Sequence, residues 1–179
     1  SKLIIVSNRL PLNITIENND LLISSSSGGL ATGMSSVHSQ GGSLWIGWSG
    51  IDEESLDVNV KKKIHDELIN ENCASVTLTQ NDVEDFYYGL SNKTLWPLFH
   101  YFTEFSTFDN KQWESYKKVN QKFADVVVSN LSDGDRVWIH DYQLMLLPSM
   151  IRKIKPNVTI GFFLHIPFPS YEIFRIFPW

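Results

Sequence analysis

Three side chains suited to binding phosphate or sugar hydroxyls each stand directly after a short apolar stretch. They are Arg9, Asp141 and His165. A guanidinium can form two charge-assisted hydrogen bonds with a phosphate, and a carboxylate accepts strong hydrogen bonds from hydroxyl groups. A histidine beside them can donate or accept a proton near neutral pH. This combination of residue types favours a site for a phosphorylated sugar.

Each of these residues also has a purely structural explanation. Arg9 could form a surface ion pair, and Asp141 could cap the start of a helix, which is the commoner role for an aspartate there. His165 could be a structural histidine, although the prolines at 167 and 169 favour a rigid functional loop. The residue types alone leave these alternatives open.

A loop of four serines and two glycines, Ser24–Gly29, precedes a segment with helical character. Free N–H groups at a helix start can bind an anion, so Gly28 and Gly29 are candidates for a phosphate loop. A flexible glycine turn explains the loop equally well. The dinucleotide fingerprint would need glycine at position 30, where the chain has Leu30, which weakens the case for a nicotinamide-dependent oxidoreductase.

The chain offers little for metal or covalent chemistry. Its Asp-x-Asp sequence, Asp133-Gly134-Asp135, precedes an apolar stretch, and Asp-Gly is a strong turn signal, so we predict a turn there. No histidine, cysteine or carboxylate cluster has the spacing of metal ligands, and no nucleophile elbow is present. We therefore expect neither a metal nor another cofactor.

The elements that must position these residues alternate between strand and helix. Such alternation, with several fully apolar strands, predicts an α/β fold: a Rossmann-like, mostly parallel sheet with helices on both faces. Ligands of such folds bind beyond the carboxyl ends of the strands, where the candidate residues stand. Strands are predicted at Leu3–Ser7, Ser43–Trp48, Ala74–Thr79, Arg136–His140 and Val158–Leu164, the first and last of them buried, with a hairpin of Leu12–Ile16 and Leu21–Ser24 around Glu17-Asn18-Asn19-Asp20. Helices are predicted at Leu30–Ser39, Val60–Asn72, Asp82–Leu90, Lys111–Asn130 and Pro148–Lys155.

Composition restricts the class of protein further. The chain has 179 residues, enough for one domain with its own core, and 42% of them are hydrophobic. Its formal net charge of -5 argues against nucleic acid or an anionic membrane as the partner. One cysteine, Cys73, excludes an internal disulfide and favours the cytoplasm. No apolar run is long enough for a membrane span or signal peptide. The apolar end Phe174–Trp179 suggests a cut through a longer protein.

Six motifs stand in order along the chain: Ser7–Pro11, Ser27–Gly33, Trp45–Gly50, Asn92–Tyr101, Trp138–Leu144 and Gly161–Pro169. Together they resemble the trehalose-6-phosphate synthases, a family of retaining glycosyltransferases (family 20). The resemblance extends from residue 3 to residue 179. Members of this family have two Rossmann-like domains that face each other across a cleft, the GT-B architecture.

The resemblance implies transfer of glucose from UDP-glucose to glucose 6-phosphate with retention at the anomeric carbon and without a metal. Asp141 and His165 would be the catalytic residues. Glucose 6-phosphate would be bound by Arg9, Trp48, Tyr87, Trp96 and Asp141, and UDP-glucose by Gly28, Gly29 and His165. We favour Trp48 over Trp45 and Tyr87 over Tyr88, the neighbouring aromatic residues that compete for these roles.

The resemblance also implies a division of labour. Residues 1–179 would form the amino-terminal, acceptor-side domain, and the carboxyl-terminal, donor-binding domain is absent from the chain. The full enzyme could be a homo-oligomer. The main rival is a regulatory or sugar-phosphate-sensing relative with the same fold and no catalysis.

Overall fold

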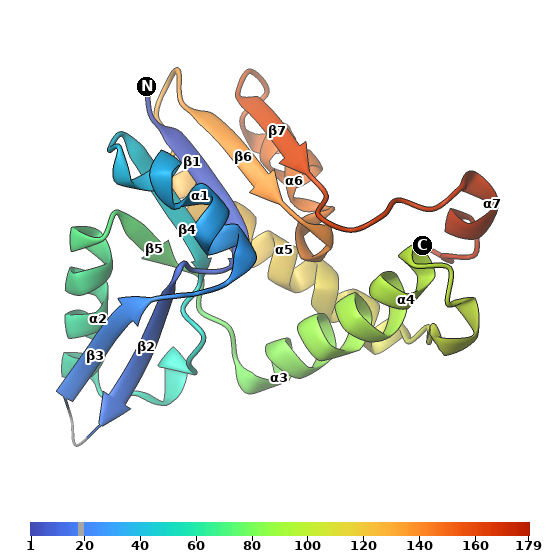
Figure 1. The fold of residues 1–179 in the computed structure, drawn as a ribbon, viewed down its shortest axis with the longest axis horizontal. Helices are drawn as coiled ribbons and strands as arrows, with labels where there is room; N and C mark the ends of the chain where they lie inside the picture. Colours follow the sequence, from blue (N-terminus) through green and yellow to red (C-terminus); the bar gives the residue numbers. More distant parts are fainter. Residues whose placement is uncertain (18–19) are drawn as a thin grey trace.

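A five-stranded parallel sheet organises the chain in this computed structural model, which describes residues 1–17 and 20–179 (Figure 1). The strand order is β5-β4-β1-β6-β7, and every neighbouring pair is parallel. All the carboxyl ends therefore meet at one edge, as predicted. The strands are β1 (Leu3–Arg9), β4 (Ser43–Trp48), β5 (Cys73–Ser75), β6 (Arg136–His140) and β7 (Thr159–Phe163).

Helices cover both faces of this sheet, which confirms the predicted fold class. Strand β1 shows why: Ile4 and Val6 enter one hydrophobic cluster, whereas Ile5 enters the other. Because side chains alternate along a strand, an uninterrupted apolar strand needs cover on both sides. The cluster around Ile5 lies under α1 (Gly29–Ser39), α2 (Val58–Asn70) and the hairpin of β2 (Leu12–Glu17) and β3 (Asp20–Ser25), and the other lies under α5 (Asn110–Asn130) and α6 (Leu147–Ile154).

The hairpin pairs antiparallel, as expected, from Leu12 opposite Ser25 to Glu17 opposite Asp20. The central residues of its predicted turn, Asn18 and Asn19, lie outside the described residues. Short elements complete the order: 3-10 turns η1 (Glu53–Ser55), η3 (Thr103–Phe105) and η4 (Tyr142–Leu144), and helix α7 (Tyr171–Phe174). Within the described part of the chain, none of the helices is both long and apolar enough to cross a membrane.

Two strand predictions need correction. The strand expected over Ala74–Thr79 ends at Ser75, because the chain turns toward a helix that Thr79 caps. The strand expected to be buried over Val158–Leu164 is the exposed edge strand β7, with Phe163 50% exposed. Apolar composition therefore identified this strand but not its position at the edge, where it has only β6 as a neighbour.

The helix predicted over Asp82–Leu90 is much longer. It runs as α3 (Gln80–Asp82), a π-helix η2 (Val83–Leu95) and α4 (Trp96–Phe99). A capping box between Thr79 and Asp82 starts it. Gly89 does not end it, because the missing side chain makes room for Gln112 of α5, which a Cβ would approach to 2.7 Å. Trp96 therefore begins α4 inside a continuous helical run.

Candidate functional site

A pocket of about 250 Å³ opens at the carboxyl ends of β1 and β6. These strands flank the point where the chain order reverses, since β4 and β5 continue to one side of β1 and β6 and β7 to the other. Such a reversal is where open α/β sheets bind ligands. The structure brings five candidate residues into the lining of this pocket: Arg9, Gly28, Gly29, Tyr87 and Asp141.

Arg9 is held by the neighbouring strand β4. Its guanidinium carbon lies 5.0 Å from the centroid of the Trp48 ring, a cation–π contact. It also lies over Gly50, where φ is +90° and a side chain would overlap the guanidinium. Gly47 allows the strands to approach, since a Cβ there would lie 2.8 Å from the backbone carbon of Arg9. Both glycines of the Trp45–Gly50 motif therefore position Arg9.

The two tryptophans of that motif have different roles. Trp45 is 1% exposed, and its Nε1 donates to the hydroxyl of Ser7 at 2.7 Å. That hydroxyl in turn donates to the carbonyl of Arg9 at 2.7 Å. Trp45 belongs to the hydrophobic core and reaches the pocket wall, whereas Trp48 is half-buried and stands beside Arg9 without lining this pocket.

Tyr87, and not Tyr88, lines the pocket with Arg9 and Asp141. Tyr88 is 51% exposed and lies beside Trp48 in a separate hollow. Trp96 is outside the pocket lining and stacks on His100 at 3.9 Å between ring centroids.

The π-helix relates Tyr87 to Trp96. The N–H of Trp96 donates to the carbonyl of Ser91, five residues earlier, so the wide turn continues to this residue. At about 4.4 residues per turn, the step of nine positions from Tyr87 to Trp96 makes about two full turns. Both aromatic residues therefore share a face, whereas an α-helix would put them on opposite faces. On this side of the helix, Asn92 accepts from the Tyr142 hydroxyl at 2.8 Å.

Asp141 is the N-cap of η4 and also contacts the segment that follows β7. Its Oδ1 caps η4 by accepting from the N–H of Tyr142 at 3.0 Å, and it also accepts from the N–H of His165 at 3.2 Å. Its backbone has φ of +77°, an unusual conformation for a residue with a side chain. Backbone strain of this kind costs about 1–3 kcal/mol and clusters at functional sites. The capping explanation is thus correct, and the carboxylate still reaches the pocket.

His165 lies at the rim and outside the lining of this pocket. Its ring Nε2 is 3.0 Å from Nδ1 of His140, a buried residue at the end of β6. Burial and the nearby His165 lower the pKa of His140 from 6.5 to about 4. His140 is therefore neutral at physiological pH.

Sequence reasoning gave no functional role to the buried polar residues in the pocket wall, each less than 10% exposed: Ser7, Asn8, His140 and Gln143. Asn8 Oδ1 and His140 Nε2 have no hydrogen-bond partner within the described part of the molecule. The available signal was their position, since Asn8 and His140 each precede a candidate residue at the end of a buried strand.

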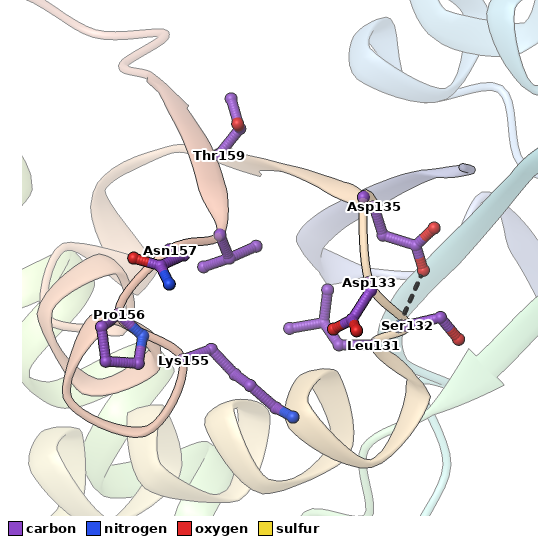
Figure 2. Close-up of a pocket in the computed structure, with 10 residues that line it drawn as sticks. Leu131, Ser132, Asp133, Asp135, Lys155, Pro156, Asn157 and Thr159 are labelled. Atoms are coloured by element: carbon purple, nitrogen blue, oxygen red, sulfur yellow. Dashed lines mark hydrogen bonds between the residues drawn. The ribbon is translucent and has the colours of Figure 1, made fainter.

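A second pocket, of about 430 Å³, lies at the opposite edge of the sheet, at the amino ends of β6 and β7. Figure 2 shows Lys155 and Asn157 facing the segment Ser132–Asp135 across it. The Asp133-Gly134-Asp135 sequence is a turn, as predicted: Gly134 has φ of +82°, and Asp135 accepts from the N–H of Ser132 at 3.0 Å. This aspartate pair is therefore structural and remote from the candidate site.

The described residues include no group of three or more histidine, cysteine, aspartate or glutamate side chains that could hold a metal ion. The buried Asp82 is the most strongly paired carboxylate. It accepts from Lys122 at 2.6 Å and from Lys118 at 3.1 Å, and these lysines and the N–H of Thr79 lower its pKa. This cluster joins the start of α3 to α5 and has no contact with the pocket.

The chain is thus a Rossmann-like α/β domain with a guanidinium, aromatic rings and a carboxylate at the switch point of its parallel sheet. All 179 residues match the family described as glycosyltransferase family 20. The chain belongs to this family.

Several similar proteins carry names from trehalose synthesis. An α,α-trehalose-phosphate synthase (UDP-forming) of Aspergillus fumigatus is 45% identical over 99% of this chain and 35% of its own length. A structure from E. coli with UDP-2-fluoro glucose bound is 35% identical, with a TM-score of 0.75 over 99% of this chain and 36% of that one. A synthase from Burkholderia xenovorans in complex with glucose-6-phosphate is 31% identical, with a TM-score of 0.74 and the same coverage. The chain thus spans about a third of the length of these relatives.

Proposed function

We propose that this chain is the acceptor-side, amino-terminal domain of a synthase that transfers glucose from UDP-glucose to glucose 6-phosphate with retention. The products would be trehalose 6-phosphate and UDP. The observation that carries the proposal is the meeting of Arg9, Tyr87 and Asp141 in one pocket at the switch point between β1 and β6. The names of the similar proteins, and the two ligands in their structures, support the same substrates.

In this proposal Arg9 binds the phosphate of glucose 6-phosphate. Its guanidinium is preorganised by the Trp48 ring and the space above Gly50, so little side-chain freedom remains to be lost on binding. Tyr87, with Trp96 on the same helix face, borders the acceptor, and Asp141 accepts hydrogen bonds from its hydroxyls.

The donor diphosphate would lie against the start of α1. Gly28 is the N-cap of this eleven-residue helix and makes no side-chain capping bond, which leaves the first N–H groups available to an anion. Gly28 and Gly29 both line the pocket, and His165 at the rim would contact the transferred glucose. An oxygen of the departing diphosphate would take the proton of the acceptor hydroxyl. Catalysis would therefore rest on positioning and on electrostatic stabilisation of the diphosphate. No metal or other cofactor enters this proposal, and the lone Cys73 suits a cytoplasmic enzyme.

Calorimetry on Arg9→Ala tests the phosphate role. Loss of a charge-assisted pair costs about 1.5–3 kcal/mol, so affinity for glucose 6-phosphate should fall about 10- to 150-fold. Affinity for glucose should hardly change. Arg136→Ala, an exposed arginine at the amino end of β6, is the matched control and should bind both ligands normally. Equal losses for both ligands in Arg9→Ala would rule out a phosphate contact.

The domain assignment has its own test. Incubated with UDP-glucose and glucose 6-phosphate, the 179-residue chain should release no UDP at an enzymatic rate, because the proposed donor-binding domain is not part of it. Release at ~1 per second or faster would show that this chain carries the whole chemistry.

A further inference from the structure

Two consecutive residues at the end of β6 hold His165 by different parts. The carboxylate of Asp141 accepts from its backbone N–H at 3.2 Å, and Nδ1 of His140 lies 3.0 Å from its ring Nε2. Register brings them together, since β6 and β7 pair in parallel up to His140 opposite Phe163. The ring of His165 is therefore oriented by a neighbour that is itself buried.

The contact between the two rings needs one proton, and its donor can be deduced. A neutral imidazole carries hydrogen on one nitrogen only, so either His140 donates from Nδ1 or His165 donates from Nε2. If His165 donated, His140 would carry its own hydrogen on Nε2. That nitrogen is buried and lacks a hydrogen-bond partner among residues 1–17 and 20–179. Nε2 of His140 is unpartnered in either tautomer, and a buried donor without a partner is rarer in proteins than a buried acceptor without one, so the geometry favours donation by His140.

The surroundings of His140 keep its own imidazole ring neutral. Its ring is 1% exposed and packs against Trp138 at 4.7 Å and Phe163 at 6.4 Å between centroids. The ionisable neighbours of His140 are His165, across the ring contact, and Asp141, the next residue in the chain. The carboxylate of Asp141 already accepts from two backbone N–H groups. Burial is the main reason why the pKa of His140 falls to about 4.

We propose that His140 is a positioning residue that fixes His165 in the tautomer with hydrogen on Nδ1. In this tautomer Nε2 of His165 is occupied as an acceptor, and the ring offers a single N–H donor to an incoming ligand. The ligand part rests on the proposed function: the donor would point to a hydroxyl oxygen of the transferred sugar. His165 would then bind as a hydrogen-bond donor and not act as a base through Nε2.

The test is nitrogen-15 NMR of the histidine rings in the 179-residue chain at pH 7, without any ligand. Free histidine in water prefers hydrogen on Nε2, so the expected signature is distinctive: both His140 and His165 should show a protonated Nδ1 and an unprotonated Nε2. His100 is an internal reference, because its Nδ1 lies 2.6 Å from the carbonyl of Trp96, which can only accept. Exposed His65 gives the behaviour in water.

Two variants separate positioning from mere packing. His140→Asn retains an amide N–H donor near the position of Nδ1, so His165 should keep its tautomer. His140→Leu removes the donor, so His165 should shift toward the behaviour of His65. A protonated Nε2 on His165 in the unsubstituted chain, or a tautomer that His140→Leu leaves unchanged, would overturn the proposal.

If His140→Leu does not fold, the unsubstituted chain and His140→Asn still decide the question. These measurements use no substrate, so they stand even if Arg9→Ala shows no selective loss of glucose 6-phosphate affinity. That calorimetric failure would refute the proposed phosphate contact of Arg9 and leave the histidine tautomers as measured.

Discussion

Mild acid should destabilise this fold mainly through the buried imidazole of His140. Its pKa is lowered from 6.5 to about 4 in the folded chain, because burial opposes the charged form. The unfolded chain therefore binds a proton at a higher pH than the folded chain does. As far as His140 is concerned, the free energy of unfolding has its full value above pH 6.5 and decreases as the pH falls toward 4.

The difference between the pKa of 6.5 and the pKa of about 4 lowers the free energy of unfolding by about 3 kcal/mol at a pH below both values, since one pKa unit is worth 1.36 kcal/mol. Between pH 7 and pH 4.5, a group with these two pKa values removes about 2 kcal/mol from the free energy of unfolding. The carboxylates of Asp82 and Asp135 act in the same direction, but their lowered pKa values confine their loss to still lower pH.

The assay is urea unfolding, followed by tryptophan fluorescence, at pH 7 and pH 4.5. His140→Asn is the comparison, because asparagine does not titrate and retains a donor to His165. The unsubstituted chain should lose about 2 kcal/mol more than the variant between the two pH values. The absolute stability of the variant does not enter, since only the change with pH is compared. If both proteins lose the same free energy, the imidazole is not buried in the neutral form and the reasoning fails.

Two further predictions concern packing. Gly47→Ala should lower the free energy of unfolding in urea by more than ~2 kcal/mol, because its Cβ would lie 2.8 Å from the backbone of Arg9. Gly29→Ala should lower it by less than ~0.5 kcal/mol, because no atom lies within 4 Å of the added carbon. Similar losses in the two variants would contradict the close approach at Gly47. Burial raises the pKa of Cys73 to about 12, so its thiol should resist iodoacetamide at pH 8 until denaturant is added, and rapid labelling of the folded chain would show that the residue is accessible.

Local patterns in the sequence were sufficient for the sheet and most helices. Strand β4 was predicted to the residue because Gly41-Gly42 precedes it and a serine-glycine turn follows Trp48. Strand β1 was recognisable because its apolar run is short and uninterrupted. Such signals depend on neighbours in the chain, so they survive without tertiary information.

Features that depend on distant residues were not predictable in this way. The exposure of β7 follows from its place at the sheet edge, and apolar composition says nothing about that place. The helix predicted over Asp82–Leu90 continues to Phe99, and the small size of Gly89 within it serves a contact with Gln112 on another helix. The ring contact between His140 and His165 joins residues 25 apart through strand register.

Some residues of the candidate site were likewise predictable from local patterns, and others were not because they depend on tertiary contacts. Position after buried strands was enough to find Arg9 and Asp141, since the parallel sheet carries both to one edge. Position in the sequence could not show that Trp45 is the buried tryptophan of its motif and Trp48 the partly exposed one, because the contacts of Trp45, such as its bond to Ser7, are with another strand. It also missed Asn8, whose side chain is buried in the pocket wall.

The π-helix has a consequence for how this segment can evolve. Its wide turns keep Tyr87 and Trp96 in phase only while Trp96 stands nine positions after Tyr87, with eight residues between them. A substitution between them changes one side chain, but a single-codon deletion would rotate one aromatic ring relative to the other by about 80°. Lineages can therefore vary the composition of Tyr88–Leu95 and not its length. In a deletion scan of the gene, we expect Tyr88–Leu95 to tolerate no frame-preserving deletion, whereas the loop after β3, at Ser26 and Ser27, should tolerate the loss of one serine.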